Sequence, residues 1–223
     1  MPGAYNLLLS PHPDDLVFSA FSILSKKTNN LALVFFNVSS FTRWPIRSVK
    51  LISSYRTLED RAILRSLKTK VRYLFSEDDS VKRSKGTDRL SSWDIKVDLP
   101  RRIFSPLGVG GSPNHLQVRN WAIERWIAWD KKCELIFYED LPYAAKIRNA
   151  EQIESQMISE LRPSCGMIEK KLEPLSASQV ARNMRLCKAY FSQTDYSEII
   201  GDYAKIRGTS TSTGFAEMFY RVV

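Results

Sequence analysis

Short apolar runs alternate along this chain with longer segments of helical periodicity. Five apolar runs predict buried strands: residues 5–9, 31–38, 70–75, 101–105 and 133–138. Four other segments repeat apolar residues every three or four positions, as amphipathic helices do: residues 16–24, 49–67, 116–129 and 150–161. Strands that alternate with helices predict one α/β domain, spanning residues 1–223, around a mostly parallel sheet.

Smaller elements are predicted elsewhere in the chain. Pro163 is expected to end the helix that begins at Ala150, because proline lacks the N–H that a helix interior requires. Residues 76–100 are polar and weakly periodic, and we interpret them as a long excursion that forms a substrate loop or a mobile cover. The remaining segments predict a strand outside the main parallel sheet, two helices and a final strand: residues 165–172, 176–191, 198–206 and 215–223.

Residues 10–15, Ser-Pro-His-Pro-Asp-Asp, lie between the first predicted strand and the first predicted helix. Each proline pushes the residue before it toward extended geometry, so that His12 and Asp15 can converge at the carboxyl edge of the sheet, where open α/β sheets bind ligands. An imidazole and a carboxylate at this spacing suit a divalent metal such as zinc. An Asp before an apolar helix is also a common N-cap, and the hexapeptide alone leaves both interpretations open.

The chain has only two histidines, His12 and His115, and they occur in similar surroundings. Each lies in a proline-containing turn, after a strand or a glycine-rich loop and just before a helix. Together with Asp15 they would supply three protein ligands and leave a position for water, which is the pattern of a catalytic zinc site. The second histidine therefore favours the metal interpretation over the helix cap.

Four stretches in order resemble the motifs of a known family, the PIG-L/LmbE-like zinc-dependent N-deacetylases. They are the hexapeptide, an Arg-x-x-Glu helix motif, a glycine-rich run ending in His, and a stretch found in a subgroup with sugar-like substrates: residues 10–15, 56–59, 106–119 and 138–144. Residues 217–220 add a weaker similarity. The resemblance implies a Rossmann-like, LmbE-like three-layer sandwich.

The resemblance also implies a site and a reaction. His12, Asp15 and His115 would bind Zn²⁺ or another divalent metal, and Asp14 would be the general base that takes a proton from the metal-bound water. Arg56 would contact substrate hydroxyls or help to shape the site. The implied reaction removes an N-acetyl group from an amino sugar or a sugar-containing metabolite. The divergent loops, especially residues 76–100, suggest a specialised biosynthetic substrate.

Some of these residues also have a purely structural interpretation. Arg56 could form a helix-surface ion pair with Glu59 or Asp60. Asp140 and Tyr143 follow a predicted strand, where they would either bind substrate or form an ordinary turn. The sequence leaves both alternatives open for each of them.

The chain departs from the family pattern at three positions. Ser112 stands where the second motif usually has another His, and Ser can donate a hydrogen bond to an oxyanion but cannot carry a proton and positive charge near neutral pH. Losing such a donor costs about a hundredfold or more in rate. Asn114 replaces an Asp, and Leu16 replaces a Glu. Two alternatives therefore stay open: action on another amide or acyl group, and a non-catalytic protein that binds a glycan or phosphate.

Composition narrows the picture further. No apolar run reaches the roughly 18 residues that span a bilayer, and no signal peptide is evident at the N-terminus. The three cysteines have neither disulfide nor zinc spacing, which favours a reducing cytoplasm. The net charge is +9, yet no nucleic-acid motif accompanies it, so we interpret the basic residues as a solvated surface. The predicted partner is a small N-acetylated, sugar-like substrate and not nucleic acid; homo-oligomer formation stays open.

Overall fold

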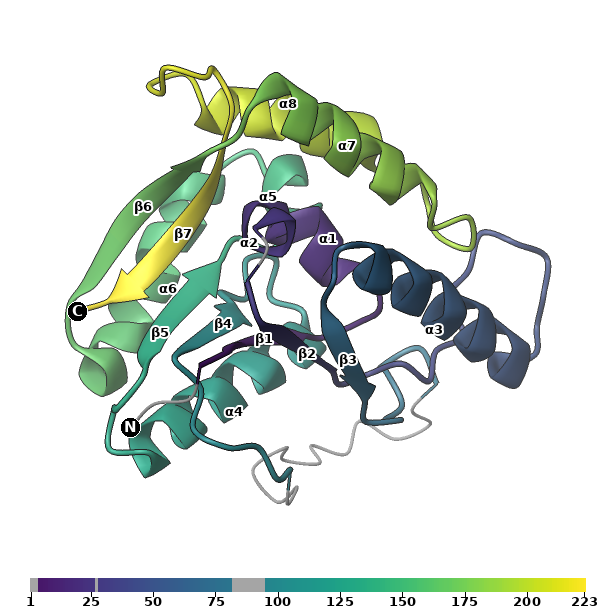
Figure 1. Cartoon of the computed structure of the whole chain (residues 1–223), viewed down its shortest axis with the longest axis horizontal. Helices are drawn as coiled ribbons and strands as arrows, with labels where there is room; N and C mark the ends of the chain where they lie inside the picture. The colour runs from purple at the N-terminus through teal and green to yellow at the C-terminus, as the bar shows by residue number, and fades with distance from the viewer. Residues whose placement is uncertain (1–3, 27, 82–94) are drawn as a thin grey trace.

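The computed structural model describes residues 4–26, 28–81 and 95–223 of the chain. Within these residues, one seven-stranded sheet runs through the molecule in the order β3-β2-β1-β4-β5-β7-β6 (Figure 1). Its strands are β1 Asn6–Ser10, β2 Asn30–Val34, β3 Lys70–Tyr73, β4 Arg102–Pro106, β5 Glu134–Tyr138, β6 Ile168–Pro174 and β7 Ala216–Val222. The first five are parallel, whereas β7 runs antiparallel to both β5 and β6. The predicted mostly parallel sheet is confirmed.

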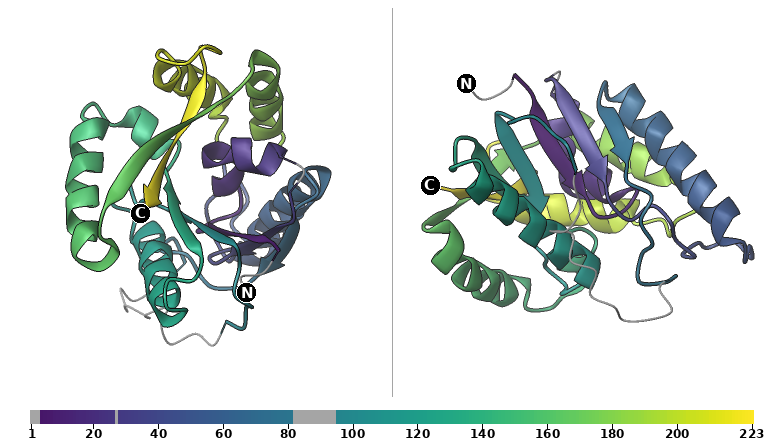
Figure 2. Two further views of the ribbon diagram at one scale, coloured as in Figure 1. Left: turned by 60° about the vertical axis from the view of Figure 1, so that its left-hand side comes forward. Right: turned by 90° about the horizontal axis from the view of Figure 1, so that it is seen from below.

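Helices cover both faces of this sheet and complete the three layers that the sequence predicts (Figure 2). They are α1 Asp15–Ser19, α2 Phe21–Ser25, α3 Val49–Ser66, α4 Pro113–Ala128, α5 Tyr143–Lys146, α6 Ala150–Cys165, α7 Ala177–Lys188 and α8 Ser197–Arg207. Helices α4 and α6 lie on one face, and α1, α2, α3, α7 and α8 lie on the other. Strand β1 is therefore covered on both sides, and the side chains of Leu7, Leu8 and Leu9 are wholly buried.

The first predicted helix, residues 16–24, is in fact two short helices that meet at Ala20. Ala20 leaves the helical conformation with φ −139° and ψ 36°. The backbone N–H groups of Phe21 and Ser22 donate to the Glu217 carboxylate on β7, at 2.8 and 2.9 Å. A distant carboxylate thus satisfies the donors that a continuous helix would have paired, which is why local periodicity does not reveal the break.

The prediction that Pro163 ends α6 is wrong, because the helix continues to Cys165. A proline near the end of a helix leaves only one late hydrogen bond unmade. The turn after it is closed by Gly166, which has a φ of +82° and donates its N–H to Arg162 O at 2.8 Å. A buried Cys165 side chain holds this last turn against the core.

The segment predicted as a separate strand, residues 165–172, joins the main sheet as β6, at its edge and antiparallel to β7. Two tryptophans of α4, Trp121 and Trp126, are buried in the core. The three cysteines are free, and all of them are buried. Among the described residues, none of the helices is long and apolar enough to cross a membrane.

Candidate metal centre and catalytic cleft

The candidate site lies where three neighbouring strands of the sheet end. Strand order reverses between β1 and β4, since β2 and β3 extend the sheet to one side and β4 and β5 to the other. His12 and Asp15 follow β1, His115 follows β4 by way of the glycine-rich loop, and Asp140 follows β5. Parallel α/β sheets bind ligands at such a switch point, beside the carboxyl ends of the strands.

Hydrogen bonds within the hexapeptide close the turn after β1. Ser10 Oγ donates to His12 O at 2.6 Å, and His12 N donates to Asp15 Oδ2 at 2.7 Å. Asp14 stands at the N-cap of α1 but makes no side-chain cap hydrogen bond, and its φ is +105°. A left-handed conformation is costly for a residue other than glycine, and it is typical of functional sites. The helix-cap interpretation therefore does not account for Asp14.

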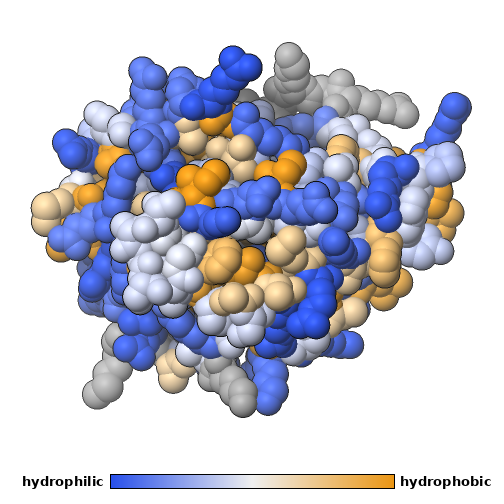
Figure 3. Space-filling view, turned by 90° about the horizontal axis from the view of Figure 1, so that it is seen from above, coloured by the Kyte–Doolittle hydropathy of each residue, from blue (hydrophilic) through white to orange (hydrophobic). Residues whose placement is uncertain are grey.

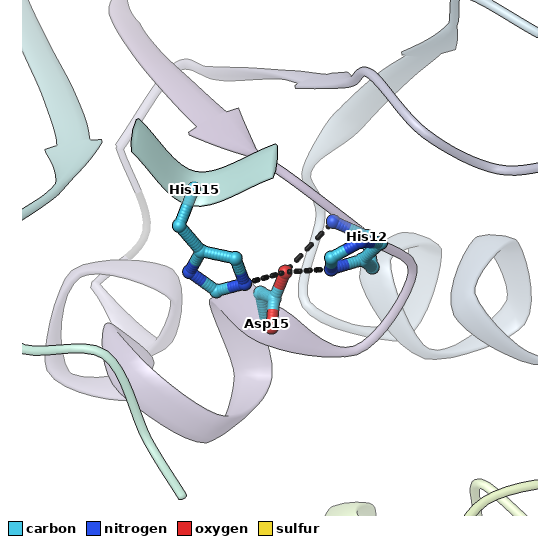
Figure 4. A group of neighbouring side chains, drawn as sticks. All are labelled: His12, Asp15 and His115. Carbon is cyan, nitrogen blue, oxygen red and sulfur yellow. Dashed lines mark hydrogen bonds and ion pairs between the residues drawn. The ribbon is translucent and has the colours of Figure 1, made fainter. Parts of the chain in front are cut away.

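The structure brings His12, Asp15 and His115 together as the sequence predicts (Figure 4). Asp15 Oδ2 lies 3.2 Å from His12 Nδ1 and 3.5 Å from His115 Nε2. One donor atom from each residue lies within 4.8 Å of the other two. Two imidazoles and a carboxylate at this separation can converge on one divalent cation.

Asp140 fixes the orientation of His115. Its Oδ1 lies 2.5 Å from His115 Nδ1, and its Oδ2 accepts the backbone N–H groups of Gly108 and Val109 at 2.6 and 2.9 Å. In the neutral imidazole Nδ1 therefore carries the proton, and the Nε2 lone pair, which faces Asp15, can bind a metal. The Nε2 atom is buried and has no hydrogen-bond partner, although most buried polar atoms have one. An unpaired ring nitrogen among carboxylates fits a metal ligand.

The charge around His115 also favours a bound cation. Burial lowers the pKa of its imidazole, but the carboxylates of Asp15 and Asp140 outweigh burial and raise the pKa to about 9. With no metal present, the site therefore takes up a proton to balance its negative charge. A divalent cation would neutralise the same carboxylates more completely. The donor set and the local charge both fit a divalent metal.

Asn114, one of the departures from the family pattern, contacts the other histidine. Its Nδ2 lies 2.9 Å from His12 Nε2, whereas its own Oδ1 is buried without a partner. Rotating the amide by half a turn would let Oδ1 accept the proton of His12 Nε2. His12 Nδ1, which faces Asp15, would then present a lone pair to a cation. A neutral amide can thus orient His12.

Arg56 is buried beside Asp14 and does not form the alternative ion pair on the helix surface. Its Nη2 lies 3.5 Å from Asp14 Oδ2, and its Nη1 donates to Ser39 Oγ at 2.7 Å. Glu59, the other end of the Arg-x-x-Glu motif, accepts the backbone N–H of Ser192 at 3.0 Å. Burial raises the pKa of Asp14 well above its ordinary value, although the Arg56 guanidinium opposes this shift.

Asp60 is a site residue that the sequence did not reveal. It is 2% exposed, and its Oδ1 accepts the backbone N–H of Asp14 at 3.3 Å. The hydroxyls of Tyr190 and Tyr73 donate to Asp60 Oδ1 and Oδ2, each at 2.8 Å. Asp60 therefore holds the left-handed backbone of Asp14 in place. Its position four residues after Arg56, on the same face of α3, was the only local signal.

A cleft of about 260 Å³ opens at this site. The site residues that line it are His12, Asp14, Asp15, Arg56, Ser112, Asn114 and Tyr143. Aromatic and polar side chains form the rest of its wall, among them Phe41, Asp78, Lys146, Gln193 and Tyr196. Polar groups beside aromatic rings suit a sugar-like ligand, whose hydroxyls need hydrogen bonds and whose C–H faces need apolar contact.

The other three predicted site residues, Tyr143, Asp140 and Ser112, differ in their access to the cleft. Tyr143 packs edge-on against the His115 ring at 5.3 Å between centroids, so it is available to a ligand in the cleft. Asp140 does not line the cleft and is not placed to contact a substrate, because its side chain is wholly buried behind His115. Ser112 is the N-cap of α4 but makes no side-chain cap hydrogen bond. Residues 82–94, within the predicted excursion, lie outside the described residues.

Solved structures share this fold over nearly the whole chain. The zinc-inhibited form of teicoplanin deacetylase Orf2 aligns with a TM-score of 0.67 over 98% of each chain, at 17% sequence identity. N,N'-diacetylchitobiose deacetylase from Pyrococcus horikoshii aligns with a TM-score of 0.65 over 98% of this chain and 83% of its own, at 16% identity. GalB, the 4-carboxy-2-hydroxymuconate hydratase from Pseudomonas putida KT2440, aligns with a TM-score of 0.62 over 99% of this chain and 97% of its own, at 13% identity.

No family model matches the sequence, and the search of curated proteins finds no match either. The structural likenesses confirm the predicted resemblance at the level of the fold, which is that of LmbE-like deacetylases. Deacetylases and a hydratase share this fold, so the fold alone does not determine the reaction. The argument for function depends on the side chains in the cleft.

Proposed function

We propose that this protein is a zinc-dependent hydrolase that removes an N-acetyl group from an amino sugar or a sugar-containing metabolite. The observation that carries the proposal is the unpaired His115 Nε2, which lies among the donor atoms of His12 and Asp15 with Asp14 alongside. The deacetylases that share the fold support the choice of reaction. Their low sequence identity is the reason that the choice needs a direct test.

His12, Asp15 and His115 would hold the metal. A bound Zn²⁺ lowers the pKa of water to near 7 and polarises a carbonyl. Asp14 would accept the proton that the attacking water loses, because burial raises the pKa of its carboxyl and makes it a stronger base than an exposed aspartate. It would then donate that proton to the leaving nitrogen, so that the C–N bond breaks to give acetate and a free amine.

The remaining cleft residues would position the substrate. Arg56, held between Asp14 and Ser39, presents a fixed guanidinium that can bind sugar hydroxyls and keep Asp14 in place. The hydroxyl of Ser112, which makes no helix-cap hydrogen bond, can donate a hydrogen bond to the negative charge that develops on the amide carbonyl oxygen. Tyr143 can pack against the acetyl group or the sugar ring.

The proposal is tested by measuring metal content and hydrolysis on the same purified protein. We expect stoichiometric zinc and release of acetate from at least one N-acetylated sugar in a panel. Asp14→Asn should keep the zinc and lower the turnover number by about 10²–10⁴, the usual contribution of a general base. A zinc-loaded Asp14→Asn variant that hydrolyses amides at the wild-type rate contradicts the mechanism.

Ser112 favours a second candidate, hydrolysis of a different amide or acyl group in the same metal site. A serine hydroxyl is a weaker hydrogen-bond donor than a protonated histidine and carries no charge. This favours a substrate whose oxyanion needs less stabilisation. Product analysis against a panel of acyl groups separates the two candidates. If Ser112→His raises acetyl hydrolysis, the protein is a slowed deacetylase; if it does not, another acyl group is favoured.

A further inference from the structure

The outward side of α3 exposes an apolar stripe that the proposed reaction does not use. Leu51, Tyr55 and Leu58 lie three and four positions apart, on one side of the helix, and are 52%, 45% and 59% exposed. The ring of Trp44, from the preceding loop, packs edge-on against Tyr55 at 5.4 Å between centroids. Exposed leucines are common singly, but a continuous stripe with aromatic neighbours marks a surface that binds something.

Basic residues flank this stripe and acidic residues are absent from it. Arg47, Lys50 and Arg65 are exposed, and residues 41–58 contain no Asp or Glu. The two acids of the helix point elsewhere: Glu59 binds Ser192, and Asp60 is buried beneath Asp14. We define the α3 surface as Arg47, Lys50, Leu51, Tyr55, Leu58 and Arg65, together with Trp44.

This combination of side chains matches one kind of partner better than others. Apolar and aromatic residues on a helix with a basic flank are the pattern of helices that lie in the interface of an anionic bilayer. Nucleic acid would pair with the cations but would leave the leucines in water, and an apolar protein partner would leave the cations unpaired. Tryptophan and tyrosine also favour the headgroup level of a bilayer.

The position of the α3 surface is compatible with this partner. Helix α3 forms one end of the molecule in Figure 1, and the corresponding end in Figure 3 shows apolar side chains among strongly hydrophilic ones. Phe41, which is 47% exposed and lines the cleft, lies under the Arg56 guanidinium at 5.9 Å from its ring centroid. Arg56 lies on the buried side of α3, so the cleft and the α3 surface border different sides of the same helix.

We propose that the α3 surface docks the protein peripherally on an anionic lipid bilayer. The leucines and the aromatic rings enter the headgroup region, and Arg47, Lys50 and Arg65 bind the negative surface. Because the basic residues are attracted to the negative lipid surface, the association should weaken as the ionic strength rises. The inference does not depend on the reaction proposed above.

Flotation of the full chain with lipid vesicles tests the proposal. The protein should float with phosphatidylcholine vesicles that contain phosphatidylglycerol, and should stay at the bottom with phosphatidylcholine alone. The double variant Leu51→Ser/Leu58→Ser should bind at least about tenfold more weakly, because its apolar insertion is lost. The double variant Lys50→Glu/Arg65→Glu should bind the anionic vesicles at least about fivefold more weakly for each basic residue removed.

Matched changes on α8 supply the control. Ile206 is 63% exposed and follows Lys205, yet it lies on another helix. Ile206→Ser and Lys205→Glu should float like the wild type. Unchanged melting temperature and unchanged hydrolysis of a free substrate, where it is found, show that the α3 variants still fold.

Three results would overturn the docking proposal. One is wild-type protein that fails to float with anionic vesicles at low salt. Another is flotation that persists in both α3 double variants. The third is a dimer in sedimentation experiments without lipid that Leu51→Ser/Leu58→Ser dissociates, because the α3 surface would then bind a second copy of the chain.

Discussion

Asp140 and Asp60 support two different parts of the candidate site: Asp140 supports a metal ligand, and Asp60 supports the proposed base. Each is a buried carboxylate that receives three hydrogen bonds. Asp140 is held by two backbone N–H groups of the glycine-rich loop and orients a side chain, the His115 imidazole. Asp60 is held by two tyrosine hydroxyls and holds a backbone, that of Asp14. The first carboxylate thus acts on metal binding, and the second acts on the proposed base.

The difference predicts that the two aspartates affect different measurements. Removing Asp140 frees the imidazole to turn and leaves the N–H groups of Gly108 and Val109 unpaired. Removing Asp60 leaves the metal ligands in place but allows the left-handed Asp14 backbone to relax. If both changes alter the same quantity to the same extent, the comparison fails.

The largest effect is expected from Asp140→Ala on metal affinity. Carboxylates that orient a metal-binding histidine contribute about 10–100-fold to affinity, so zinc should bind more weakly by that factor. Competition with a chromophoric chelator measures the dissociation constant. Asp60→Leu is the matched control and should bind zinc like the wild type. Wild-type zinc affinity in Asp140→Ala contradicts the role assigned to Asp140.

An effect of comparable size is expected from Asp60→Leu, on turnover instead of on metal affinity. Misplacing a catalytic group by an ångström costs up to about a hundredfold, so the turnover number should fall by about 10–100-fold while KM and zinc content stay nearly constant. Asp60→Asn should restore most of the rate, because its Oδ1 can still accept from Asp14 N and Tyr190. Equal losses in the Leu and Asn variants would mean that charge, and not position, is what matters.

A double variant shows whether Asp60 acts through Asp14. In an Asp14→Asn background the base is already absent, so adding Asp60→Leu should lower the rate little further. Rates should be compared at saturating zinc. Two losses that multiply in the double variant would show that Asp60 contributes by a route independent of Asp14.

The smallest effect concerns stability as a function of pH. Burial raises the pKa of the Asp60 carboxyl from 3.8 to about 6, against the opposing hydrogen bonds of the two tyrosines. Because the folded pKa is the higher one, this group's contribution to stability is fully present below pH 3.8 and is lost as the pH rises to about 6. Urea unfolding of metal-free protein should show that decline in the wild type and a flatter profile in Asp60→Asn. Identical stability profiles in the wild type and Asp60→Asn would contradict the contribution assigned to Asp60.

The sequence predicts the strands and the candidate metal ligands, but it does not predict Asp60 or the helix break at Ala20. The strands and the three candidate ligands follow from local patterns, since each ligand lies beside a proline turn at the end of a strand. Asp60 acts on Asp14, which is 46 positions away, and on Tyr190, which is 130 positions away. The break at Ala20 likewise depends on Glu217, 196 positions after Phe21. Pairings over such distances arise only from the tertiary fold and leave no periodic signal.

The glycine-rich loop also has a role that its sequence does not reveal. The backbone of Gly110, with a φ of +100°, lies close to the Tyr143 side chain: a Cβ at Gly110 would lie 2.8 Å from Tyr143 Cβ. The sequence did not indicate that the loop also supplies two N–H groups to Asp140. Neither alternative that the sequence left open for Asp140, a substrate contact or an ordinary turn, included its role behind the histidine.

X-ray absorption at the zinc edge of the purified protein tests the central claim most directly. The account predicts a shell of nitrogen and oxygen ligands at about 2.0–2.1 Å with scattering from two imidazoles, and loss of one imidazole in His115→Ala. Sulfur at about 2.3 Å, or a spectrum that is unchanged in His115→Ala, would place the zinc elsewhere and contradict the metal centre described here.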